Sequence, residues 1–156
     1  MGVAAQDMFM GMPTGTLDKK GRACIPANYR QVLAAQNTSG GVYIRKHPDK
    51  PTLECFGEKI FAQFQQAQPP QEDPFFSEAY DDKAFSVFAM TELLAFDDNG
   101  RVRLPDDFIA HAGLGETVRF VGMRDKFEIW DPARLTAISE ERLASARKLR
   151  KPSAAP

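Results

Sequence analysis

An internal repeat constrains the fold of this chain more than any other feature of its sequence. Residues 17–29 align with residues 96–108 without a gap, because Asp, Gly, Arg, Pro and an aromatic residue recur 79 positions apart (97 minus 18, and 105 minus 26). A second similarity follows each copy, where residues 53–56 resemble residues 127–130. Such a repeat has to be identified first, because a fold assigned without it is misread.

Each copy of the repeat predicts a β-α-β-β unit. A turn is expected at the first loop (residues 18–22) and at the second loop (residues 97–101), since Asp bonds the backbone ahead of it and Gly accepts a positive φ. Pro26 and Pro105 end the next strand and open a helix. Helices are therefore expected at residues 27–35 and 106–112, and further strands at 41–45, 52–56, 117–122 and 126–130.

The segments outside the two copies predict helices and a linker. Aromatic and aliphatic residues recur at mostly helical spacing in residues 58–66 and 75–90, which indicates a core or a subunit interface rather than a cofactor site. An amphipathic helix is expected at residues 132–149. The chain divides into a first unit (8–56), inter-unit helices with a Pro/Gln/acidic linker at 68–74 (57–90), a second unit (91–132), and a C-terminal helix with a frayed tail (133–156).

Composition narrows the classes of protein. Hydrophobic residues make up 43% and charged residues 26% of the chain, as in globular proteins. Neither a signal peptide nor an apolar run of the ~20 residues that span a bilayer is present, so we expect a cytoplasmic protein. Cys24 and Cys55 have no C-x-x-C partner and are expected to be buried hydrophobic residues, and His47 and His111 have no neighbours at ligand spacing. We therefore expect no metal and no cofactor.

The net charge of −1 conceals an uneven distribution of charge. Between residues 18 and 46, Asp18 is the only acid among the lysines and arginines, and bases also predominate in residues 142–151. Acids predominate between residues 49 and 98. One basic face suits a protein that meets phosphate on one side, although charge alone does not distinguish this from a solvated surface.

Six short motifs, in order, resemble the MraZ family of bacterial transcriptional regulators, whose members carry two AbrB/SpoVT-type units. The resemblance covers about residues 8–149 and implies an α+β, mostly β fold. In that fold, two tandem βαββ units interlock as one swapped-hairpin AbrB-like barrel, with extra helices between and after them. The motifs lie at residues 8–11, 18–22, 97–101, 111–114, 121–122 and 126–130.

The same resemblance implies a sequence-specific DNA-binding regulator. Family members bind G-rich direct repeats in double-stranded promoter DNA upstream of their own division and cell-wall operon, and repress it. Their subunits assemble into ring-shaped homo-oligomers. A nucleoid-associated protein without a membrane partner is therefore expected.

The positions that match the family's DNA-contacting loops are Lys19, Lys20, Arg22 and Arg101. Arg22 is expected to bind guanine O6 and N7 in a bidentate manner, while the two lysines bind phosphate. The second loop has Asp98 and Asn99 in place of the lysines, so we expect it to contribute less to DNA binding. Loop-structuring roles are expected for Asp18, Gly21, Asp97 and Gly100, with Asp18 bonded to backbone N–H groups or to Arg22.

Two other functions remain open from the sequence. Asp18 and Asp97 occupy equivalent positions, so a pseudo-two-fold axis could pair them as an aspartic dyad. Lys19 and Lys20 would keep Asp18 ionised, however, and no nucleophile with a base, metal cluster or phosphate loop is present, so we do not expect an enzyme. A protein-binding module, such as an AbrB-type antitoxin, is the second alternative, although antitoxins usually have one copy of the unit and a longer tail.

Overall fold

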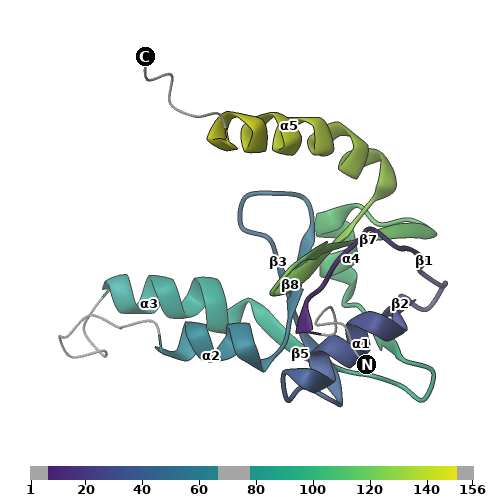
Figure 1. Ribbon diagram of the computed structural model, residues 1–156. Helices are drawn as coiled ribbons and strands as arrows, with labels where there is room; N and C mark the ends of the chain where they lie inside the picture. The colour runs from purple at the N-terminus through teal and green to yellow at the C-terminus, as the bar shows by residue number, and fades with distance from the viewer. Residues whose placement is uncertain (1–6, 67–77, 151–156) are drawn as a thin grey trace.

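The computed structural model describes residues 7–66 and 78–150, which form an α+β fold (Figure 1). The predicted linker at 68–74, the start of the 75–90 segment and the predicted tail after residue 150 lie outside the described residues. The first unit comprises β1 (Thr14–Thr16), β2 (Arg22–Cys24), α1 (Ala27–Ala35), β3 (Gly41–Lys46) and β4 (Leu53–Phe56). The second unit comprises β5 (Thr91–Ala95), β6 (Arg101–Arg103), α4 (Asp106–Ala112), β7 (Thr117–Met123) and β8 (Lys126–Trp130).

The repeated β-α-β-β pattern is confirmed in both copies. Pro26 and Pro105 lie immediately before α1 and α4 with φ of −51° and −58°, which is the conformation that proline prefers. Gly113 ends α4 in a left-handed conformation with φ of 61°, as helix C-termini commonly do. Local residue chemistry therefore sets where these helices begin and end.

Strands of the two units pair with each other in two sheets. The larger sheet has the order β1-β7-β8-β4-β3-β5, so β1 pairs with the hairpin of the second unit and β5 with the hairpin of the first. β2 and β6 form a separate two-stranded antiparallel ribbon, the β2–β6 ribbon. The larger sheet is open, because its edge strands β1 and β5 do not pair with one another within the described residues, and the two-stranded ribbon does not close either. The α+β class is thus confirmed, whereas a closed barrel is not. The expectation of a mostly β chain is wrong, because helices, above all the long α5 (Pro132–Arg150), span more of the described residues than strands do.

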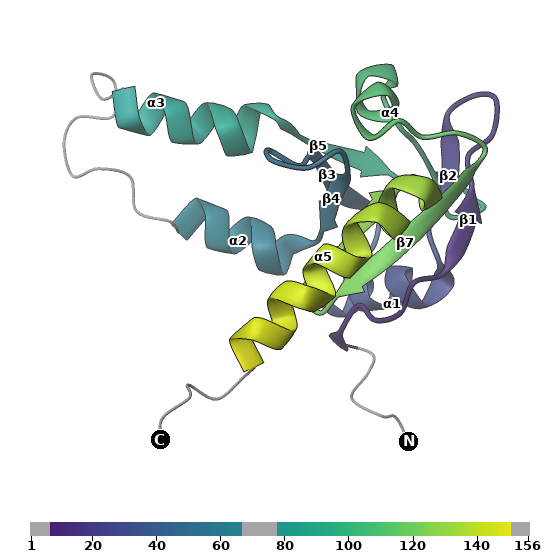
Figure 2. The same ribbon diagram turned by 90° about the horizontal axis from the view of Figure 1, so that it is seen from above.

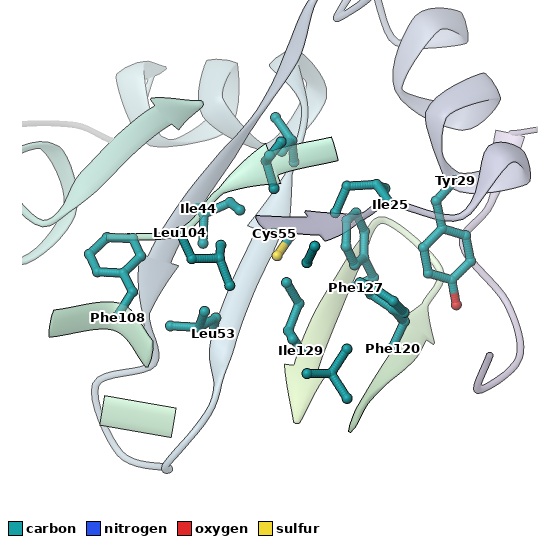
Figure 3. Packing of buried hydrophobic residues seen from close by; sticks show 14 of the residues in the cluster. Ile25, Tyr29, Ile44, Leu53, Cys55, Leu104, Phe108, Phe120, Phe127 and Ile129 are labelled. Atoms are coloured by element: carbon teal, nitrogen blue, oxygen red, sulfur yellow. The ribbon is translucent and has the colours of Figure 1, made fainter. Parts of the chain in front are cut away.

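Both units contribute to one hydrophobic core. Ile25 and Leu104, which follow β2 and β6, pack toward side chains of β3, β4 and β8 (Figure 3). An aromatic cluster links Phe9 and Tyr29 of the first unit to Phe127 of the second, with ring centroids 4.8–5.3 Å apart. Because inward positions alternate along each strand, the apolar residues of the repeat face a single interior.

Two helical regions extend from the sheets. α2 (Glu58–Gln66) and α3 (Glu78–Ala84), the latter continued by the π-helical turn η3 (Phe85–Ala89), lie side by side at one end of the molecule (Figures 1 and 2). Phe61 and Phe88 join them, with ring centroids 5.8 Å apart. The expected helical character of this region is confirmed for its described part.

The C-terminal helix α5 (Pro132–Arg150) follows β8 and crosses the sheet before projecting away from it (Figure 2). The helix expected at residues 132–149 is confirmed, but only the first part of its apolar face is buried. Leu135 is buried, whereas Leu143 and Leu149 are 57% and 88% exposed, because the helix leaves the sheet after its first turns. Across the described ranges, 7–66 and 78–150, no helix has the length and apolar content that crossing a bilayer requires.

Candidate nucleic-acid interface

In the first loop, the side chain of Asp18 organises the backbone and Arg22. Its Oδ1 accepts hydrogen bonds from the backbone N–H groups of Lys20 and Arg22, each at 2.9 Å. Its Oδ2 accepts the Nε–H of Arg22 at 2.7 Å. Gly21 completes the turn with φ of 79°, a conformation that residues with a side chain rarely adopt.

The second loop repeats this arrangement bond for bond. Oδ1 of Asp97 accepts the backbone N–H groups of Asn99 and Arg101 at 2.9 Å, and Oδ2 accepts Arg101 Nε–H at 2.8 Å. Gly100 has φ of 77°. The two loops are therefore equivalent in backbone geometry and differ only in the side chains between Asp and Gly.

Both aspartates are held in the ionised form by these bonds. The backbone N–H of Arg22 lowers the pKa of Asp18 below its ordinary value, and the Arg22 guanidinium adds to this effect. The N–H and guanidinium of Arg101 lower the pKa of Asp97 in the same way. Each arginine is thus fixed through Nε, while its two terminal nitrogens make no hydrogen bond to any described residue and remain available.

The β2–β6 ribbon brings the two arginine-bearing strands together. Arg22 lies opposite Arg103, Ala23 opposite Val102, and Cys24 opposite Arg101. Ala23 and Val102 are buried, so the alternate positions on both strands face outward. The ribbon lies at the opposite end of the molecule from α2 and α3 (Figures 1 and 2).

The register of the ribbon corrects one expectation from the sequence and bears on one alternative. Cys55 is buried as expected, but Cys24 is exposed, because it takes an outward position on β2. Asp18 and Asp97 precede opposite ends of antiparallel strands, and each carboxylate is engaged by its own loop. The structure therefore gives no support to the aspartic dyad.

Two arginines at this site were missed by sequence reasoning. Arg103 is exposed on β6, and the signal that could have found it is its position two residues after Arg101, on the same face of the strand. Arg30 of α1 lies against the second loop, where a Cβ on Gly100 would come within 2.6 Å of its guanidinium carbon. Ile109 takes the equivalent place beside Gly21 in the first loop.

The positive charge is concentrated at the first-loop end of the ribbon. Lys19 and Lys20 are exposed there, and the register adds Arg22 and Arg103. At the other end, the second loop carries Asp98 and Asn99 between Asp97 and Arg101. The interface is symmetric in backbone and asymmetric in charge.

A buried charged cluster lies at the centre of the larger sheet, outside this interface. Glu54 and Glu128 are cross-strand partners, and their carboxylates lie within 4.8 Å of each other and of His47. Arg45 and Lys126 occupy the two oxygens of Glu54, while Trp130 and Arg142 occupy those of Glu128. Because each carboxylate oxygen already accepts a protein donor, the cluster fits an ion-pair network better than a metal site.

Comparisons with known proteins agree in pointing to one family. The family model described as "MraZ protein, putative antitoxin-like" matches residues 87–153. A "Transcriptional regulator MraZ" from Xanthobacter autotrophicus is 36% identical over 147 residues, covering 92% of this chain and 90% of the relative. Proteins of the same name from Azorhizobium caulinodans and Rhodospirillum rubrum are 36% and 33% identical, covering 93% and 86% of this chain and 90% and 86% of the relatives.

Proposed function

Because this chain belongs to the MraZ family of transcriptional regulators, we propose that it binds double-stranded promoter DNA through the β2–β6 ribbon and its two loops. We do not propose a catalytic activity. The observation that carries the proposal is the fixed position of Arg22, whose Nε is bound by Asp18 while its terminal nitrogens are available. The major groove presents guanine O6 and N7 as paired acceptors, and a guanidinium held in place can bind both with little further loss of entropy.

Lys19 and Lys20 are proposed to hold the adjacent phosphates. Both side chains are exposed beside Arg22, and long flexible ammonium groups suit phosphate contacts that position a protein without reading sequence. Arg101 is held as Arg22 is and is proposed to make a secondary contact, since its loop has no lysines. The share of DNA binding is therefore expected to be larger at the first loop.

The target is proposed to be a set of G-rich direct repeats upstream of the protein's own division and cell-wall operon, which it represses in the cytoplasm at the nucleoid. One chain offers few contacts, so several chains in a ring-shaped homo-oligomer would gain affinity by binding several repeats together. Exposed apolar side chains on η3 and the adjoining β5 support self-association: Phe85 is 65%, Phe88 43% and Leu93 60% exposed.

The exchange of strands between the units supports the finer architecture. β1 pairs with β7 and β5 with β3, as in a swapped hairpin, and a bridge between Leu17 and Ala23 connects the end of β1 to β2. We propose that the two open sheets correspond to an AbrB-like barrel formed by the units at 8–56 and 91–132. Segments 57–90 and 133–156 would then be additions to that barrel.

Substituting Arg22 tests the proposed function. Arg22→Ala should weaken binding to a duplex from the chain's own upstream region by about 1–3 kcal/mol, and should reduce the preference over a duplex of shuffled sequence. Lys19→Gln should instead weaken binding to both duplexes alike and reduce the salt dependence. Binding would be measured by fluorescence anisotropy at fixed salt, and wild-type selectivity in the Arg22 variant would contradict the proposal.

A protein-binding role is the second candidate, favoured by the antitoxin-like description of the matching family model. The exposed apolar residues of η3 would then meet a toxin rather than another copy of the chain. Adjacent genes distinguish the two candidates. A toxin gene next to this one favours the antitoxin, whereas a methyltransferase and division genes favour the regulator.

A further inference from the structure

We infer that Arg103 is a further DNA-contacting residue, which binds backbone phosphate at the first-loop end of the ribbon although it belongs to the second unit. This inference rests on the proposed function and deepens it. It assigns to one site a residue that lies far from the first loop in sequence. The assignment follows from the register of β2 and β6, which places Arg103 directly opposite Arg22.

The position of Arg103 makes it part of the same surface as Arg22. Directly opposed residues of antiparallel strands have Cβ atoms about 5 Å apart and point to the same face of the sheet. The inward neighbours Ala23 and Val102 are buried, so this face of the ribbon is the outer one. A duplex that reaches Arg22 therefore passes within reach of Arg103.

The bonding of Arg103 indicates phosphate rather than a base as its target. Arg22 and Arg101 are each fixed by an aspartate. Arg103 is exposed and makes no ion pair or hydrogen bond through its side chain to the residues described, 7–66 and 78–150. A guanidinium that is already fixed suits base reading, whereas a mobile cation can follow a phosphate and contributes through release of counterions.

The repeat shows that this contact breaks the symmetry of the ribbon. Cys24 holds the position equivalent to Arg103 and lies opposite Arg101. The first-loop end thus has Lys19, Lys20 and Arg103 around its fixed arginine. The second-loop end has Arg30 beside Gly100, but it also has Asp98, and a neutral thiol takes the place of Arg103. A ribbon charged in this way holds DNA more strongly at one end than at the other.

The inference can be tested with Arg103→Gln in the full chain, using Arg147→Gln on the exposed far end of α5 as the matched control. Binding to a duplex from the chain's own upstream region and to a shuffled duplex of equal length would be measured from about 50 to about 200 mM salt. Arg103→Gln should lower both affinities by the same factor, about fivefold near 0.15 M salt, and should reduce the salt slope by about 0.9 for each bound chain. Arg147→Gln should behave as wild type.

Arg103→Lys should restore the salt slope, which separates a lost charge from a disturbed fold. An unchanged slope in Arg103→Gln, a loss confined to the upstream duplex, or an equal loss in Arg147→Gln would overturn the inference. If the wild-type chain binds neither duplex, the proposed function fails together with this inference. If the wild-type chain binds selectively and Arg22→Ala loses that selectivity, the proposed function stands. An Arg103→Gln variant with the affinity and salt slope of wild type would then show that only the role of Arg103 is wrong.

Discussion

At the residue scale, single side chains in this protein act by fixing the backbone around them. His47 is an example outside the β2–β6 ribbon and its loops. Its Nδ1 accepts the backbone N–H groups of Asp49 at 3.0 Å and Lys50 at 3.1 Å, so the loop between β3 and β4 depends on an unprotonated Nδ1. Burial lowers the pKa of His47, and although Glu54 and Glu128 oppose this effect, Lys126 and Lys50 support it.

His47 should make stability depend on pH below about 6.5, its ordinary pKa. A group with a lowered folded pKa binds more protons in the unfolded state, so the free energy of unfolding is retained above 6.5 and falls as pH drops toward the folded value. His47→Asn keeps an acceptor near Nδ1 without the titration, and should remove this part of the pH dependence. Urea unfolding at several pH values would measure it, and an unchanged profile in His47→Asn would show that another group is responsible.

At the element scale, α5 is attached to the sheet by few contacts, one of which is a buried ion pair. Within α5 (Pro132–Arg150), all of which the structure describes, Leu135 is the buried residue. Arg142 binds Glu128 at 2.9 Å, and its guanidinium lies 5.7 Å from the ring centroid of Trp130. The Glu128 side chain is fully buried, so it depends on Arg142 for compensation of its charge.

Arg142→Ala should lower the free energy of unfolding by about 2–4 kcal/mol. The loss should stay below the roughly 5 kcal/mol that breaking a fully buried ion pair can cost. The reason is that the Arg142 side chain is 28% exposed, so water screens the pair. Adding Glu128→Gln should recover part of the loss, since the amide keeps an acceptor for Trp130 Nε1 and removes the unpaired charge. Chemical denaturation of the single and double variants measures both effects; a double variant no more stable than Arg142→Ala would argue against charge compensation.

At the scale of the whole molecule, the two units cannot be separated without opening a shared core. Phe127 of β8 contacts Phe9 and Tyr29, which precede it by much of the chain length. The backbone shows the same exchange, because Ile25 N–H donates to Gly100 and Leu104 N–H donates to Gly21. We therefore expect both units to fold and unfold as one cooperative body.

Phe127→Ala should destabilise the whole chain by about 3–5 kcal/mol, since it removes a fully buried ring and leaves a cavity. Trp130, the single tryptophan, reports on the second unit, while far-ultraviolet circular dichroism reports on both units. The two signals should change together in wild type and in the variant. Leu149→Ala, at a position that is 88% exposed, is the control and should have little effect; separate transitions would show that the units fold independently.

The local structure of this protein could be predicted from its sequence. The repeat, the two prolines and the Asp and Gly of the loops predicted both β-α-β-β units, because helix starts and tight turns depend on nearby residues. It also marked the two loops as the candidate site. The residues that follow each loop in its strand can also be identified in the sequence. The sequence of one strand does not indicate, however, which residues of another strand will lie opposite them.

Which residues share a surface, in contrast, depends on how distant strands pair in the folded protein. The register of β2 and β6 placed Arg103 beside Arg22 and exposed Cys24, and the β4–β8 pair brought Glu54 and Glu128 together in the interior. The course of α5 away from the sheet left Leu143 and Leu149 exposed. These outcomes depend on pairing between segments far apart in the chain, and a shift of one residue in register would turn every side chain to the other face.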